Sequence, residues 1–348
     1  MKGEDKVNRG IKELKGSKGI KSSEGTKGVK ELKGSKGTKS SEGTKGVKEL
    51  KGSKDLKDSK ALNLRGPKLV QLLASFIRAT SSSLPEDAEK ALRAAMRREA
   101  KGSPARTILE TILANVALAR KNGTPVCQDT GTLTFFVDET LRRKVTSDVF
   151  GQAVALATEK GWLRRNTIDS VSGKSIDTNV CPGAPVVHYV SAAAETTAGH
   201  GQIKLIMKGG GSENMSMQFS LPDAALGAGR DLEGVRRAVL AAVQHAQGFG
   251  CAPGILGVCI GGDRASGYEE AKHQLLRNLT DVNPDARLAK LEKRILKEAN
   301  TLGIGPMGLG GATTLLAVKI GSRPRVPASF FVTVAYLCWA ARRRTLAL

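Results

Sequence analysis

The sequence contains five cysteines, and cysteine thiolates are ligands for zinc, for other soft metal ions and for iron–sulfur clusters. They are Cys127, Cys181, Cys251, Cys259 and Cys338. Cys127 in TPVCQDTGT and Cys251 in GFGCAPG lie in Gly- or Pro-rich turns, where the backbone is free to approach a cluster. Cys259 lies inside an apolar run and is expected in the core. No two cysteines have zinc or ferredoxin spacing, so spacing alone leaves all five as candidates.

Three glycine-rich segments are the second feature that could do chemistry, because their backbone amides could bind an anion. They cover residues 208–214 (KGGGSEN), 259–262 (CIGG) and 303–314 (GIGPMGLGGATT). None of them has the lysine–serine pair of a Walker A loop or the pattern of a dinucleotide fingerprint. The sequence therefore leaves two interpretations open, an anion-binding cleft or a set of tight turns.

The histidines give little support to a serine-hydrolase triad or to a histidine-rich metal site. There are four, at positions 188, 200, 245 and 273. His188 lies in a β-rich run and His245 on a helix face, and both are expected to be packed or surface residues rather than bases.

The chain of 348 residues is strongly basic, with a formal net charge of +22 and 40% hydrophobic residues. Such a charge favours anionic partners, whereas an aromatic content of only 4% offers little for stacking on bases. A non-catalytic, basic nucleic-acid-binding protein is thus one alternative, although the composition does not favour it. The odd number of cysteines points to a reducing compartment, and we expect a cytoplasmic location.

Residues 1–62 are expected to form a disordered tail rich in Lys, Gly and Ser. Two tandem repeats, at residues 16–33 and 34–51, contain few aliphatic residues and no aromatic ones, so they cannot bury enough surface to fold. The tail is either a polyanion-binding arm or a solvated extension. Residues 63–348 are expected to form one domain.

Helices and strands are both expected in residues 63–348. Helical periodicity covers residues 67–79, 106–123 and 232–247, and Asn283-Pro284 is expected to open another helix. Gly123 is expected as a C-cap. One helix face is expected to contain Ile108, Ile112, Leu113, Val116 and Ala117. Strands are expected at residues 132–137, 185–190, 202–207, 255–260, 313–318 and 329–334. Because the two types mix without strict alternation, the expected class is α+β.

No membrane segment is expected. The N-terminus lacks the apolar region of a secretory signal, and the longest near-apolar run, residues 326–341, is shorter than the roughly 18 residues of a spanning helix.

Residues from about 124 to 343 resemble the α subunit of two-subunit class I (iron–sulfur) fumarate hydratases and L-tartrate dehydratases. The matching strings, in family order, are PVCQDTGT, GWLRRN, KGGGSEN, GCAPGILGVCIGG, GIGPMGLGG and PASFFVTVAYLCWAARR. The resemblance implies a lyase of the hydro-lyase type that reversibly hydrates fumarate to malate. The alternative it leaves open is dehydration of L-tartrate or of another 2-hydroxy acid, because KGGGSEN is closer to the fumarate branch and LCWAARR to the tartrate branch.

The resemblance also implies the cofactor and its ligands. It implies a 4Fe–4S cluster held by Cys127, Cys251 and Cys338, with one iron open as a Lewis acid, and it removes Cys181 and Cys259 from the candidates.

The substrate contacts implied by the resemblance are Gln128, Asp129, Arg164 and the backbone amide of Gly210. Arg165 is the close alternative to Arg164. An arginine suits a dicarboxylate because its guanidinium group binds a carboxylate through two parallel hydrogen bonds.

The catalytic base is not identified in this chain, because the family carries its proposed threonine base in a second domain. The resemblance therefore implies a β subunit that completes the site, a small dicarboxylate substrate and an α2β2 hetero-oligomer. One departure from the family is Val326, where many relatives have a histidine near the substrate.

Overall fold

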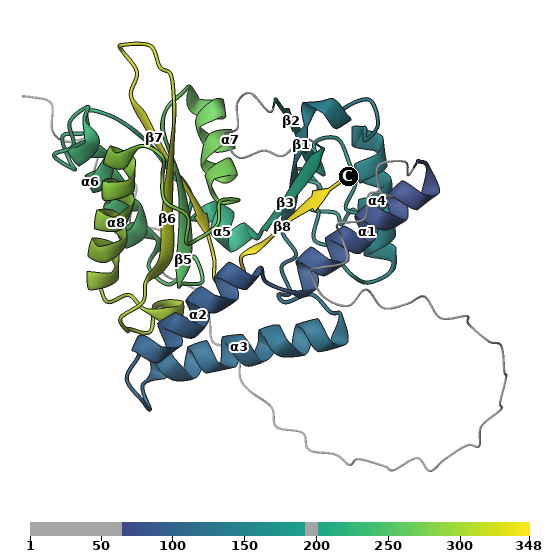
Figure 1. The fold of residues 1–348 in the computed structure, drawn as a ribbon, viewed down its shortest axis with the longest axis horizontal. Helices are drawn as coiled ribbons and strands as arrows, with labels where there is room; N and C mark the ends of the chain where they lie inside the picture. Colours follow the sequence, from purple (N-terminus) through teal and green to yellow (C-terminus); the bar gives the residue numbers. More distant parts are fainter. Residues whose placement is uncertain (1–64, 192–200) are drawn as a thin grey trace, which may run out of the picture. The chain divides into compact units, whose positions relative to one another are not determined.

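The computed structural model describes residues 65–191 and 201–348, which form two four-stranded sheets with helices packed on and between them (Figure 1). The helices are α1 (Pro67–Ser82), α2 (Glu86–Arg98), α3 (Pro104–Asn122), η2 (Glu139–Leu141), α4 (Ser147–Glu159), α5 (Gly210–Asn214), α6 (Leu232–Ala246), α7 (Arg264–Gln274), α8 (Ala286–Thr301) and η4 (Pro306–Gly308). The strands are β1 (Thr132–Asp138), β2 (Val186–Val190), β3 (Gln202–Lys208), β4 (Met217–Ser220), β5 (Gly254–Gly261), β6 (Leu315–Arg323), β7 (Phe331–Leu337) and β8 (Arg342–Ala347). The α+β prediction is confirmed, whereas the predicted tail of residues 1–62 lies outside the described residues.

The first sheet has the strand order β2-β1-β3-β8. Strand β1 runs parallel to β2 and antiparallel to β3, so that Thr134 pairs with both Val186 and Ile206. Helices α1 and α4 pack against each other beside this sheet (Figure 1). The ring of Phe150 from α4 lies 4.4 Å, centroid to centroid, from that of Phe135 in β1, which anchors α4 to the sheet.

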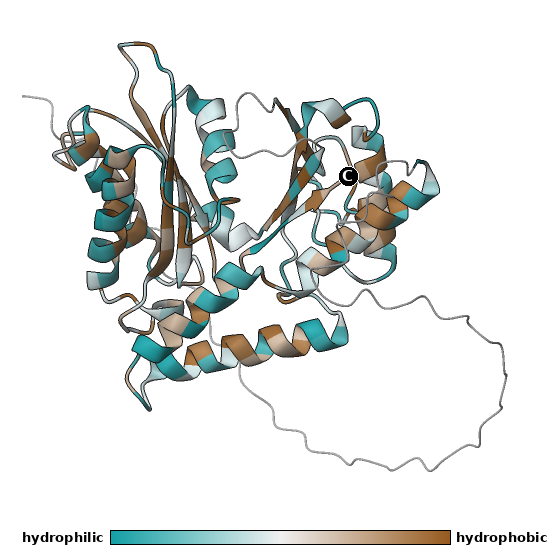
Figure 2. Cartoon of the chain, viewed as in Figure 1, coloured by the Kyte–Doolittle hydropathy of each residue, from teal (hydrophilic) through white to brown (hydrophobic). Residues whose placement is uncertain are grey.

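The second sheet has the order β4-β7-β5-β6, with α7 on one face and α6 and α8 on the other (Figure 1). Successive residues of a strand point to opposite faces, so Ile255 of β5 packs on the α7 side and Leu256 on the α6 and α8 side. Gly257 is needed because a Cβ there would lie 2.0 Å from the carbonyl oxygen of Ala271 in α7. The strands are mainly hydrophobic and the outward side of α8 mainly hydrophilic in Figure 2, as burial of both faces requires.

Helices α2 and α3 form a hairpin that leads to the first cysteine loop. Ser103 caps α3, because its Oγ accepts the Arg106 amide hydrogen at 3.2 Å. Gly123 ends α3 with φ +64°, which confirms the predicted C-cap. Ala117 is exposed, so the predicted face was wrong at that residue; the buried stripe continues to Ala119 instead.

The starts of β6 and α8 differ from prediction, and hydrogen bonds account for both differences. Strand β6 starts at Leu315, two residues late, where the Asn300 side chain accepts the Leu315 amide hydrogen at 2.9 Å. Helix α8 starts at Ala286 with Asp285 as its N-cap. Asn283 does not cap it, because its buried side chain donates to the carbonyl oxygen of Ile320 at 2.7 Å.

Strand β7 also starts later than expected, at Phe331, and extends to Leu337. Strands β4 and β8 were not predicted. The sequence RRRTLA of β8 lacks an apolar run, yet Arg342 and Arg343 in it are 1% and 7% exposed. Among the described residues, no helix is both long and apolar enough to cross a membrane.

Candidate active site

Cys127, Cys251 and Cys338 lie in three loops that converge on one hydrophobic core cluster. Cys127 lies between α3 and β1, Cys251 between α6 and β5, and Cys338 between β7 and β8. Burial raises the pKa of the Cys251 thiol, and the neighbouring Cys338 and Cys127 thiolates raise it further. The Trp339 amide donates to the carbonyl oxygen of Cys251 at 3.2 Å, which joins two of the loops. The fold therefore places near one another the three cysteines that the family resemblance singled out.

The Cys251 loop is tightly folded against the ring of Tyr336 in β7. Cys251 itself has φ +54°, an uncommon conformation for a non-glycine residue. A Cβ at Gly250 or Gly254 would lie 2.5 Å or 2.4 Å from atoms of the Tyr336 side chain. Both glycines are needed for the loop to pass this ring.

Replacing Gly254 by alanine is expected to destabilise the protein by about 1–3 kcal/mol, because the added methyl group overlaps the ring of Tyr336, which is 2% exposed. The measurement is the free energy of unfolding from denaturant titration of the metal-free protein. Gly151→Ala in α4 is the control, since its Cβ would meet only Val180 at 3.4 Å. Equal stability of Gly254→Ala and the parent would contradict the packing described.

Asp129 links the Cys127 loop to the glycine loop. Its Oδ2 accepts the Gly210 amide hydrogen at 2.6 Å, and its Oδ1 accepts from the Asn166 side chain at 3.1 Å. The Arg342 guanidinium donates to its carbonyl oxygen at 2.7 Å, so the backbone of Asp129 is also fixed. The Gly210 amide, predicted to bind substrate, is thus already turned toward a carboxylate.

Gln128 stands beside the first cysteine and is exposed. The Cys127 thiol donates to its Oε1 at 3.5 Å. Next to this residue a cavity of about 500 Å³ opens, and its lining includes Asp129, Asn166 and Gly210. The predicted contacts Asp129 and Gly210 therefore line the same opening, and Gln128 directly precedes Asp129 in the chain.

Arg164 lies on an exposed loop whose backbone is fixed by hydrogen bonds from a buried side chain. The buried Asn179 side chain donates to the Arg164 carbonyl oxygen at 2.7 Å and accepts the amide hydrogens of Asn166 and Thr167 at 3.0 and 2.9 Å. Arg165 forms an ion pair with Asp177 at 3.4 Å. The Arg164 side chain makes no ion pair with a described residue, which leaves it available for an anion.

Three residues that the sequence did not single out also contribute to the site. Asn179 holds the Arg164 loop, Arg342 fixes Asp129, and Lys208 lies buried at the end of β3. Lys208 could have been noticed as the first residue of KGGGSEN. Asn179 and Arg342 have no local signal, because their partners are distant in sequence.

The other two cysteines lie outside these three loops, although Cys259 belongs to the same hydrophobic core cluster. Cys259 is fully buried in β5, and burial raises the pKa of its thiol to about 12, as expected of a core residue. Cys181 forms an isolated backbone bridge with Ala184. His188 packs on Phe136 with ring centroids 5.1 Å apart, in keeping with the expected packing role.

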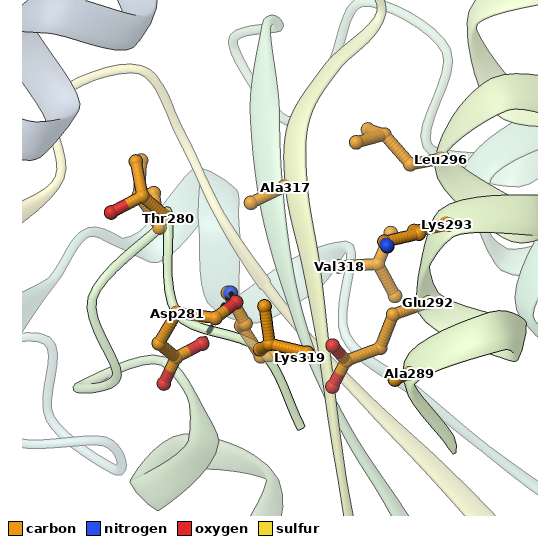
Figure 3. Close-up of a pocket in the computed structure, with 11 residues that line it drawn as sticks. Thr280, Asp281, Ala289, Glu292, Lys293, Leu296, Ala317, Val318 and Lys319 are labelled. Carbon is orange, nitrogen blue, oxygen red and sulfur yellow. Dashed lines mark hydrogen bonds and ion pairs between the residues drawn. The ribbon is translucent and has the colours of Figure 1, made fainter. Parts of the chain in front are cut away.

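A separate pocket of about 200 Å³ lies between α8 and the edge of β6 (Figure 3). In it the buried Lys319 ammonium group pairs with the Asp281 carboxylate at 2.5 Å. None of the cysteines lines this pocket, so it is not part of the thiol site.

Comparison with known proteins covers nearly all of the described chain. Residues 70–347 match the family model "Fumarate hydratase (Fumerase)". A protein of Geobacillus stearothermophilus described as a fumarate hydratase class I is 45% identical over 281 residues, which is 79% of this chain and 54% of that protein. The chain therefore spans about half the length of that relative.

Two relatives have lengths closer to that of this chain. One, from Methanocaldococcus jannaschii, is described as an L(+)-tartrate dehydratase subunit alpha and is 32% identical over 79% of this chain and 96% of its own length. The L(+)-tartrate dehydratase subunit alpha of Escherichia coli (strain K12) is 30% identical over 80% of this chain and 90% of its own length. By the extent of the match to the family model and by these identities, the chain belongs to the fumarate hydratase (fumerase) family.

Proposed function

We propose that this chain is the α subunit of a hydro-lyase that interconverts fumarate and malate, with a 4Fe–4S cluster on Cys127, Cys251 and Cys338. The observation that carries the proposal is the convergence of these three thiols from separate loops beside the paired Asp129 and Gly210. Membership of the fumarate hydratase family supports the reaction type.

The donor set fits an iron–sulfur cluster better than a single metal ion. Among residues 65–191 and 201–348, no three His, Cys, Asp or Glu side chains converge closely enough for one ion. Around a 4Fe–4S cluster each thiolate binds a different iron, so three thiols can lie farther apart and leave one iron open. When bound, the cluster supplies a Lewis acid that polarises the carbon–oxygen bond of the substrate.

The residues of this chain would bind and orient the substrate. The Arg164 guanidinium group can grip one carboxylate through two hydrogen bonds. The Asp129 carboxylate now accepts the Gly210 amide hydrogen. Once the Asp129 side chain turns away, this amide can donate to a carboxylate of the substrate instead. Gln128, exposed beside Cys127, can bind a polar group of the substrate. We assign no catalytic base to this chain and expect it on the β subunit.

Substrate identity is tested by anaerobic assay of the reconstituted protein with its β partner against fumarate, malate and both tartrate enantiomers. The relative at 45% identity is described as a fumarate hydratase, and those at 32% and 30% as tartrate dehydratase subunits, so we expect turnover of fumarate. Val326, the position at which the sequence departs from the family resemblance, is 65% exposed in the β6–β7 connection. Turnover of tartrate without turnover of fumarate would replace the assignment by the tartrate alternative.

The alternative of a nucleic-acid-binding protein depends on the basic tail, which lies outside the described residues. Deleting residues 1–62 tests it: salt-dependent binding of nucleic acid that disappears with the tail would support that alternative. We also propose a reducing, cytoplasmic location, because all five cysteines are free thiols and three of them are needed as ligands.

We further propose that the β subunit docks on an apolar rim beside the site, formed by Phe249, Met307 and Leu309, within an α2β2 hetero-oligomer. These side chains are 75%, 40% and 66% exposed. Their loops touch, because a Cβ at Gly248 would lie 2.6 Å from the Met307 carbonyl oxygen. The Phe249 carbonyl oxygen also lies 3.5 Å from the Cβ position of Gly211, next to the substrate loop. Two relatives of similar length are described as alpha subunits, which supports a partner chain.

The double variant Phe249→Ser, Leu309→Ser is expected to weaken association with the β subunit by about tenfold or more, because apolar anchors dominate such interfaces. Titration of labelled β subunit, read by fluorescence anisotropy, measures the dissociation constant. Val282→Ser is the control, since Val282 is 67% exposed but lines the pocket beside α8. Equal affinity of the double variant and the parent would move the docking surface elsewhere.

A further inference from the structure

Lys208 is a buried lysine that the proposed reaction does not use. It ends β3 with 1% of its surface exposed. Its ammonium group pairs with Glu213 Oε2 at 2.8 Å and donates to Ser216 Oγ at 2.9 Å. The other oxygen of Glu213 pairs with Lys272 of α7 at 2.7 Å. Two cations share one carboxylate, so this group of three carries a net positive charge.

The three charged residues are linked through α5 to the loop of the third cysteine. Glu213 belongs to α5, and in the same helix Ser212 Oγ accepts the Cys338 amide hydrogen at 3.1 Å. Ser216 Oγ, which accepts from Lys208, also accepts the Tyr336 amide hydrogen at 3.2 Å. A negative charge on the Cys338 sulfur favours the ammonium form of Lys208 and so raises the pKa of that lysine.

Stability alone does not account for this arrangement. Burial disfavours the ammonium form and lowers the pKa of Lys208 to about 8, although the Glu213 carboxylate opposes that shift. A buried ion pair is often no more stabilising than well-packed apolar side chains of the same size. A buried cation is useful, however, where an anionic group has to be held at low dielectric, and three thiolates with a cluster are such a group.

We propose that Lys208, supported by Lys272 across Glu213, is a positioning residue that supplies positive charge near the Cys338 loop and raises the reduction potential of the cluster. The inference rests on the proposed function, because it requires the cluster on Cys338. The same network holds α5, whose first residue is Gly210, so the charge also stabilises the loop predicted to bind the substrate.

The test is the midpoint potential of the reconstituted cluster in the full-length chain, followed by electron paramagnetic resonance without substrate. Lys208→Met is expected to shift the potential to more negative values, because reduction adds an electron where a cation has been lost. Lys272→Met is expected to give a smaller shift of the same sign, because Lys272 is partly exposed and is linked to Lys208 only through Glu213. Lys208→Arg keeps the charge and should keep the potential close to that of the parent.

Lys319→Met is the matched control. Lys319 is also a buried lysine paired with a carboxylate, that of Asp281, but it lies in the pocket beside α8 (Figure 3). The Lys319→Met protein should be less stable than the parent, but the midpoint potential of its cluster should be unchanged. If Lys208→Met does not fold, the midpoint potential of Lys272→Met tests the proposal in its place.

The possible outcomes distinguish failure of the proposed role of Lys208 from failure of the proposed function. Unchanged potentials in Lys208→Met and Lys272→Met, at full iron content, overturn the role of the charge and leave the proposed function intact. A parent protein that assembles no cluster overturns both.

Discussion

Replacing Cys338 by serine is expected to abolish cluster binding and, with it, all turnover of fumarate. A serine hydroxyl remains protonated at neutral pH and is a far poorer iron ligand than a thiolate. The side chains are nearly the same size, and the Cys338 amide keeps its bond to Ser212 Oγ, so folding should be preserved. Cys127→Ser and Cys251→Ser are expected to give the same result. Iron and sulfide content and broad visible absorption after anaerobic reconstitution provide the measurement.

The controls come from the two cysteines outside the site. Cys181→Ser should retain the cluster, because Cys181 contributes only a backbone bridge to Ala184. Cys259→Ala should also retain it, at some cost in stability, because Cys259 is fully buried in β5. A Cys338→Ser protein with its full iron content would show that the ligand set has been assigned wrongly.

The fold was predictable where hydrophobic periodicity coincides with burial. Residues 132–137 and 255–260 are strands because runs rich in β-branched, aromatic and other apolar residues fit sheets covered on both sides. Strand β8 was not predictable, since Arg342 and Arg343 are buried only through partners far away in sequence. Arg343 pairs with Asp87, and Arg342 donates to the Asp129 carbonyl oxygen. Local pattern contains no information on such pairings.

The candidate site was predictable in part for the same reason. Spacing gave no basis for choosing among five thiols, and only resemblance of the surrounding motifs singled out Cys127, Cys251 and Cys338. Their convergence arises from three loops, which the topology of both sheets brings together. Supporting residues such as Asn179 are invisible in sequence, because a side chain that holds a distant loop leaves no periodic trace.

Replacing Arg164 by alanine is expected to lower kcat/KM for the dicarboxylate by about 100-fold, which is the loss associated with a bidentate, charge-assisted pair of hydrogen bonds. The loss should appear mainly in KM if the contact is equally strong in the ground state and the transition state. Steady-state kinetics of the anaerobically reconstituted enzyme measure both constants. Cluster content should not change, since Arg164 is exposed and contacts the core only through its backbone.

Arg165→Ala distinguishes between the two neighbouring arginines that the sequence left open. Arg165 already pairs with Asp177, whereas the Arg164 side chain has no ion pair among the described residues. A guanidinium group engaged by a carboxylate has to give up that partner before it can bind a substrate, so Arg165 is the poorer anion site. We therefore expect Arg165→Ala to keep kcat/KM close to that of the parent. If Arg165→Ala has the large effect and Arg164→Ala does not, the Asp177 pair must open when substrate binds, and the roles of the two arginines are exchanged.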